Sequence, residues 1–75
     1  MRDILTLDRI QIEYADMRGP FIVVGAPQAN ALQDLLSREG FNFQILNHDF
    51  TDDVMFDLAP DTEAERLQRL LDAED

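Results

Sequence analysis

A single histidine and the acids beside it are the residues of this 75-residue chain best suited to chemistry. They fall in one short polar stretch: His48, Asp49, Asp52 and Asp53. Carboxylate oxygens are the ligands that hard cations prefer, and a calcium-binding EF-hand loop needs glycine at its sixth position and glutamate at its twelfth. A loop beginning at Asp49 has Val54 and Pro60 at those positions. Residues 47–53 are therefore predicted to form a polar turn, and no metal site is predicted.

Nucleophilic catalysis needs a nucleophile, a base and a group that orients the base. The chain has no cysteine, its only serine, Ser37, falls on the polar side of a predicted helix, and its only histidine, His48, lies in a turn. We predict no enzyme, and His48 is the only candidate general base. Gly25 precedes a helix as in phosphate-binding turns, but Ala26 and Pro27 follow it and no lysine supports it, so no cofactor is predicted.

The charge of the chain is strongly acidic and unevenly placed. Sixteen Asp and Glu residues stand against six arginines, with no lysine, which gives a net charge of −10. Residues 49–75 hold ten of the acids and two of the arginines. This charge repels phosphate backbones and anionic membranes and attracts basic partners over a Debye length of about 8 Å. We predict a basic or mixed protein partner, with neither direct nucleic-acid binding nor membrane binding.

The first eight residues do not resemble a secretion signal. Acids at Asp3 and Asp8 flank a short apolar run, so a basic start and an apolar segment of signal length are both missing. No stretch approaches the roughly 20 apolar residues that span a bilayer. We predict a cytoplasmic protein with a single domain over residues 1–75, because a chain this short has room for one core. Residues 72–75 place acids at the negative end of a helix dipole, so this tail is expected to fray.

Hydrophobic periodicity predicts four strands and two helices. The strands are predicted over residues 9–14, 21–24, 41–45 and 54–58; the second is apolar throughout and the others alternate apolar with polar residues. Leucines at helical spacing predict one helix that begins near Pro27 and is stopped by Gly40. A second helix is predicted to begin at a Thr62–Glu65 capping box and to run through Leu71.

The order of these elements predicts an α+β fold of type ββαββα. The helix between the second and third strands should make a right-handed crossover between parallel strands, which leaves room for another strand between them. Inserting the fourth strand gives order 1-2-4-3, a circular permutation of the ferredoxin-like arrangement, and inserting the first gives 2-1-3-4. The two most apolar strands belong at the centre, which favours 1-2-4-3. We predict a four-stranded antiparallel sheet with both helices on one face.

The opposite sheet face is predicted to be an interface. With Phe21 and Val23 toward the helices, Ile22 and Val24 point away, beside Met55 of the adjacent strand. A polar rim would surround them: Gln11, Glu13, Asn42, Gln44 and Asp57. An exposed apolar centre with a polar rim is typical of binding surfaces.

Two functional hypotheses follow from these surfaces. The first is a non-enzymatic binding module that engages a basic or mixed protein partner. Small acidic inhibitors, immunity proteins and antitoxins have a similar size and charge, and the hypothesis is made by analogy with that class. Its predicted partner-binding residues are Asp52, Asp53, Asp57, Glu63 and Glu65. The alternative is a homodimeric regulatory domain that holds a small molecule between sheets lined by Ile22, Val24 and Met55.

Overall fold

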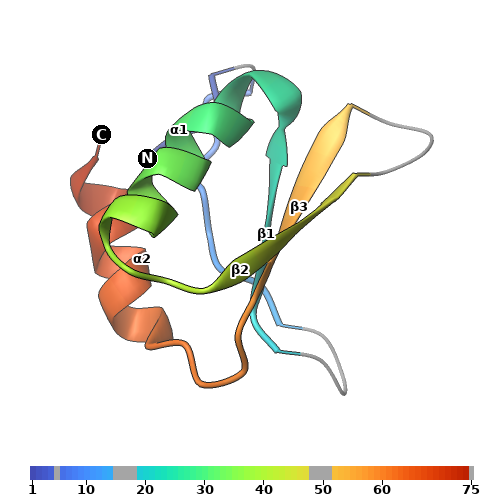
Figure 1. Cartoon of the computed structure of the whole chain (residues 1–75). Helices are drawn as coiled ribbons and strands as arrows, with labels where there is room; N and C mark the ends of the chain where they lie inside the picture. The colour runs from blue at the N-terminus through green and yellow to red at the C-terminus, as the bar shows by residue number, and fades with distance from the viewer. Residues whose placement is uncertain (5, 15–18, 48–51, 75) are drawn as a thin grey trace.

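A small three-stranded sheet carries two helices on one of its faces. The computed structural model describes residues 1–4, 6–14, 19–47 and 52–74 of the chain. In chain order the elements are β1 (Phe21–Gly25), α1 (Ala26–Arg38), β2 (Phe43–Asn47), β3 (Asp53–Leu58) and α2 (Ala64–Ala73). The sheet order is β1-β3-β2, and β3 is antiparallel to both neighbours (Figure 1). The α+β class and the antiparallel sheet with two helices are therefore confirmed.

The central position of β3 agrees with one of the two predicted strand orders. Because β1 and β2 are each antiparallel to β3, they run parallel to each other, joined through α1 as the sequence predicts. The last strand enters between them, as order 1-2-4-3 requires for these three strands. The strand predicted over residues 9–14 and the ferredoxin-like topology are not confirmed.

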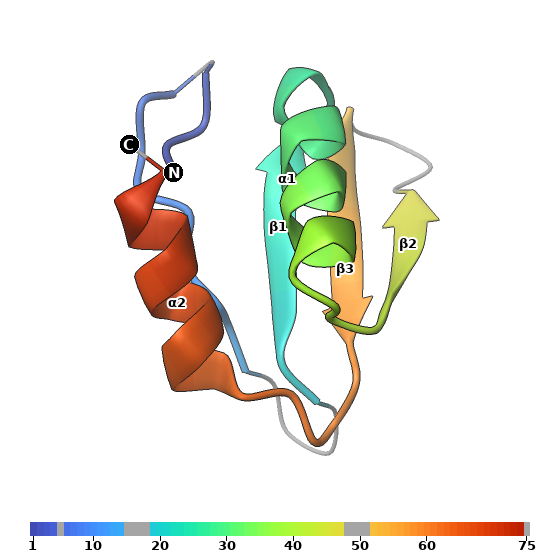
Figure 2. The ribbon, with the colours of Figure 1, turned by 60° about the vertical axis from the view of Figure 1, so that its left-hand side comes forward.

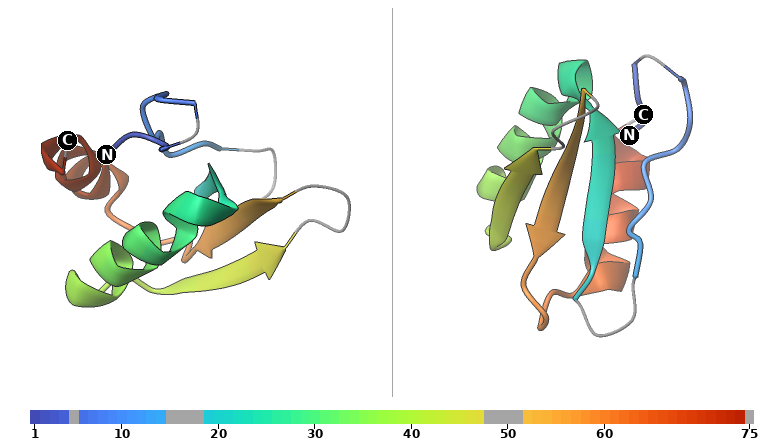
Figure 3. Two further views of the ribbon diagram at one scale, coloured as in Figure 1. Left: turned by 90° about the horizontal axis from the view of Figure 1, so that it is seen from above. Right: turned by 90° about the vertical axis from the view of Figure 1, so that its right-hand side faces the viewer.

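The core lies between the helices and one face of the sheet, and both helices lie on the same side of it (Figure 3). Ile22 of β1 lies opposite Phe56 of β3, and both side chains are fully buried. The leucines predicted at helical spacing supply the helix side of the core. Those buried are Leu32, Leu35, Leu36, Leu67 and Leu71.

Residues 9–14, predicted as the first strand, do not form a strand. It meets β1 at one pair, where Glu13 and Phe21 exchange both backbone hydrogen bonds (2.8 and 2.9 Å). Further toward the N-terminus, Gln68 of α2 holds the segment. Its Oε1 accepts from the Ile12 N–H (3.0 Å) and its Nε2 donates to the Ile10 C=O (3.1 Å). A helix side chain thus satisfies backbone groups of this segment that do not bond β1.

The helix ends agree with the sequence for α1 but not for α2. Pro27 lies in the first turn of α1, and Gly40 follows it with φ +78°, as a glycine stop requires. The Gly40 N–H donates to Ser37 C=O and the Phe41 N–H to Leu36 C=O, the pattern of a Schellman motif. The predicted capping box is wrong. The Thr62 hydroxyl donates to Ala59 C=O (2.6 Å) in the turn after β3, so α2 begins two residues later with no side-chain cap.

Replacing Gln68 by leucine is expected to destabilise the fold by about 1–3 kcal/mol, the cost of leaving partly buried backbone groups without partners. Urea denaturation of Gln68→Leu gives the change in free energy of unfolding. The control is Gln33→Leu, at an exposed position of α1. Equal unfolding midpoints for both variants would show that Gln68 does not hold the N-terminal segment.

Candidate functional site

The sheet face away from the helices carries an apolar row across all three strands. Val23, Met55 and Leu46 lie side by side in the register, and all three point away from the buried face that holds Phe56. Val23 is 37% exposed and Leu46 is 42% exposed. No described helix or loop covers this face in the right-hand view of Figure 3. We call Val23, Met55 and Leu46 the apolar row.

Acids lie on both sides of the apolar row. On one side, Asp57 lies opposite Phe21 of β1 and Gln44 of β2 in the strand register, and Glu13 lies opposite Phe21 at the edge. Residues opposite one another share a face, so these four side chains are all on the open face. On the other side Asp53 lies opposite Gly25. These described face positions hold three acids and no basic residue. The face is therefore apolar at its centre and carries carboxylates at both margins.

The predicted orientation of β1 is wrong. Ile22 and Val24 are 0% and 2% exposed, and both lie in the core under the helices. Phe21 and Val23, predicted to face the helices, lie on the open face instead. Only Met55 of the predicted interface residues is on the open face. Because β1 is apolar throughout, its sequence pattern does not show whether Phe21 and Val23 or Ile22 and Val24 are buried. The register of β1 with β3 determines which of the two pairs faces the core.

The predicted acidic residues do not form one surface. Asp53 and Asp57 lie on the open face, whereas Glu63 and Glu65 lie at the start of α2, on the helix side of the sheet. Asp52 precedes β3, and its C=O accepts from the Ala26 N–H at the start of α1 (3.0 Å). Sequence reasoning placed Glu13 in the polar rim but missed Val23 and Leu46. Leu46 lay outside the predicted strand over residues 41–45.

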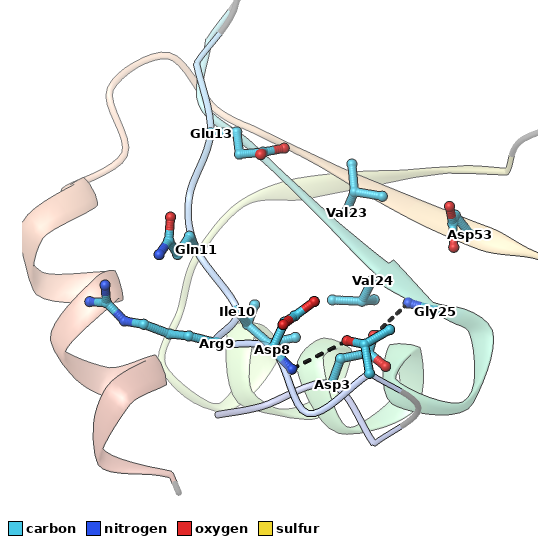
Figure 4. Close-up of a pocket in the computed structure, with 11 residues that line it drawn as sticks. Asp3, Asp8, Arg9, Ile10, Gln11, Glu13, Val23, Val24, Gly25 and Asp53 are labelled. Carbon is cyan, nitrogen blue, oxygen red and sulfur yellow. Dashed lines mark hydrogen bonds between the residues drawn. The ribbon is translucent and has the colours of Figure 1, made fainter.

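A shallow pocket of about 320 Å³ separates the N-terminal segment from the outer edge of β1 (Figure 4). At one end the buried Asp3 accepts from the Gly25 N–H through Oδ2 (2.9 Å), which holds a carboxylate at the start of α1. At the other end stands the Glu13–Phe21 pair. Val23 lines the pocket between these two tethers. The pocket is thus the gap left where the N-terminal segment leaves the sheet.

Arg9 and Asp72 make a bidentate ion pair between the N-terminal segment and α2. Arg9 Nε donates to Asp72 Oδ1 (2.8 Å) and Arg9 Nη2 to Oδ2 (2.7 Å). These hydrogen bonds lower the pKa of Asp72 from its ordinary 3.8 to about 2; desolvation opposes the shift, and a hydrogen bond from Gln68 adds to it. A second pair joins Arg38 of α1 to Glu74 (2.7 Å). Fraying of residues 72–75 stays a prediction, although Asp72 and Glu74 each hold a partner.

The residues first considered for chemistry are not brought together. His48 and Asp49 lie outside the described residues, and Ser37 is exposed on α1. The described residues contain no group of three His, Asp or Glu side chains placed to hold a metal ion. None of the described helices has the length and apolar character needed to cross a bilayer.

Comparison of the chain with protein-family models, with curated proteins and with solved structures finds no match. No function is therefore carried over from a relative, and any assignment depends on the surfaces described above.

The side-chain amide of Gln28 is a buried polar group in the first turn of α1. Gln28 is 5% exposed, and its Oε1 is buried with no hydrogen-bond partner among the described residues. Gln28→Met keeps a similar shape and removes the unpaired oxygen, so we expect a gain in stability of about 1 kcal/mol or more. Thermal unfolding measures the gain, with Gln33→Met on the exposed side as control. A lower unfolding temperature for Gln28→Met than for the control would contradict the expectation.

The stability that Asp72 contributes is expected to depend on pH in acid. Its pKa is lower in the folded chain, so the contribution is complete above about pH 4 and disappears as the pH falls through about 2. Asp72→Asn should therefore be less stable than the parent at pH 7, and the difference should shrink between about pH 4 and 2. Denaturant unfolding across this range tests it. Asp34→Asn, at an exposed carboxylate on α1, is the control. A difference that does not change with pH would contradict the ion pair.

Proposed function

We propose that this chain is a non-enzymatic binding module whose open sheet face engages a basic segment of a partner protein. The observation that carries the proposal is the apolar row of Val23, Met55 and Leu46 with acids at both margins. Burying the row would supply the favourable free energy, and the acids would orient the partner and speed its approach.

The spacing of the acids defines the partner further. Asp53 and Asp57 are four residues apart on one face of β3, and at about 3.3 Å per residue their backbones are separated by about 13 Å. Met55 lies midway between them on the same face. An extended partner segment with basic residues at positions i and i+4 and an apolar residue at i+2 would match this pattern.

The alternative, a small-molecule regulatory domain that dimerises face to face, has less support. Two of its three predicted lining residues, Ile22 and Val24, are in the core. A face-to-face dimer would also bring Glu13, Asp53 and Asp57 of each copy toward those of the other, which costs free energy unless cations intervene. A basic partner removes this conflict.

The proposal predicts that binding depends on the position of the acids and not only on net charge. The probe is a fluorescent extended peptide with arginine, leucine and arginine at alternate positions. Asp53→Asn with Asp57→Asn is expected to weaken its binding at least about tenfold, equivalent to about 1.4 kcal/mol, measured by fluorescence anisotropy.

The matched control is Glu63→Gln with Glu65→Gln, which changes net charge by the same amount on α2. It should weaken peptide binding less than about threefold, because α2 lies on the other side of the sheet. Equal losses in both double variants would show that the probe responds to overall charge alone. If the Asp53 and Asp57 variant bound the peptide as tightly as the parent chain, the open face would be excluded as the peptide-binding site.

A further inference from the structure

The outer edge of β2 is an open strand edge. β2 is last in the sheet order, and no described segment lies alongside it in Figure 2. The other edge of the sheet is partly covered, because Glu13 bonds Phe21 and Asp3 bonds Gly25. Exposed strand edges are templates for pairing with another chain unless they are protected.

The register shows which backbone groups of β2 face outward. The Ala59 N–H donates to Asn42 C=O (3.2 Å), so this pair is hydrogen bonded across the ladder. Pairs alternate along antiparallel strands, so Gln44 and Leu46 also bond β3. The N–H and C=O groups of the remaining residues point away from β3. These residues are Phe43, Ile45 and Asn47, and no described residue bonds their outward groups.

The usual protections of an edge strand are missing from β2. The strand is Phe-Gln-Ile-Leu-Asn, with no charge and no proline, in a chain whose residues are 29% charged. Its two faces are both apolar in part: Ile45 is 41% exposed on the helix side and Leu46 is 42% exposed on the open face. α1 lies over β1 and β3, and β2 is at the edge of the sheet (Figure 2).

We propose that β2 pairs antiparallel with β2 of a second copy of this chain, about a two-fold axis at Ile45. This register places Ile45 opposite Ile45 of the other copy and Phe43 opposite Asn47. All three residues have outward groups, so each facing pair can exchange two hydrogen bonds. The dimer has one continuous six-stranded sheet, and the two Ile45 side chains extend the core across the axis.

A second copy fits this edge better than a charged partner does. The outward groups match themselves under the two-fold axis, and β2 carries no charge that would recruit a basic or acidic strand. The acids on the sheet, Asp53 and Asp57, are on β3, one strand inside the edge. Each copy still carries a net charge of −10, so the dimer should strengthen as salt screens the repulsion.

Light scattering of the purified chain over a range of concentration and salt tests the pairing. We expect twice the mass of one chain at micromolar to millimolar concentration, with more dimer at higher salt. Ile45→Lys should shift the chain to monomer, because two like charges then face each other across the axis. Gln33→Lys adds the same charge on exposed α1 and should leave the dimer unchanged.

Mixing two oppositely charged variants distinguishes a loss of strand pairing between copies from a loss of folding. An equimolar mixture of Ile45→Lys and Ile45→Glu chains should recover dimers, since opposite charges then meet at the axis. Two monomeric variants that stay monomeric when mixed, with native circular dichroism, would overturn the proposal.

Cross-linking tests the register directly, because the chain has no cysteine of its own. Hydrogen-bonded antiparallel pairs have Cα atoms about 5.5 Å apart, within the range that a disulfide spans. Ile45→Cys should therefore form disulfide-linked dimers on mild oxidation, much faster than Gln33→Cys. Equal cross-linking rates, or a parent chain that is monomeric up to about 1 mM at high salt, would overturn the proposal.

Discussion

The pairing of β3 with a strand on each edge is the constraint on which the rest of this structure depends. Residues of β3 bond alternately to β1 and β2, and their side chains alternate between the helix-covered face and the open face. Phe56 is therefore buried against Ile22, while Met55 and Asp57 face outward. A slip of one residue would expose Phe56 and bury the Asp57 carboxylate, so the burial costs of both residues oppose it.

The second constraint is Gln68, which holds the N-terminal segment to α2. Its side-chain amide accepts from the Ile12 N–H and donates to the Ile10 C=O. The ion pair of Arg9 with Asp72 holds the same segment to the same helix. Since the segment returns to β1 only at Glu13, the gap between becomes the pocket beside Val23. Among the described residues the sheet therefore has two different edges, one partly covered and one open.

The sequence predicts the elements of this fold better than their faces. Helical leucine spacing, and Gly40 as a stop, are local signals that the structure confirms, and the alternation over residues 54–58 identifies the buried side of β3. β1 has no polar residue before Gly25, so only its pairing with β3 could show that Ile22 is buried. The alternation over residues 9–14 is real, but Ile10 and Ile12 bond the side chain of Gln68, which no local pattern encodes. Of the three apolar residues predicted on the open face, Ile22 and Val24 are therefore in the core, and only Met55 faces outward.

The two proposed surfaces are linked through charge. Pairing at β2 would leave both open faces on the same side of one sheet, so that the two apolar rows become neighbours across the axis. The repulsion that opposes pairing comes from the net charge of −10 on each copy, and part of that charge is the acids that would bind a basic partner. A basic segment bound to either face lowers this repulsion. By reciprocity of linked equilibria, the dimer must then bind basic segments more tightly than the monomer does. If both proposals hold, an uncharged edge beside an acidic face would couple assembly to partner binding.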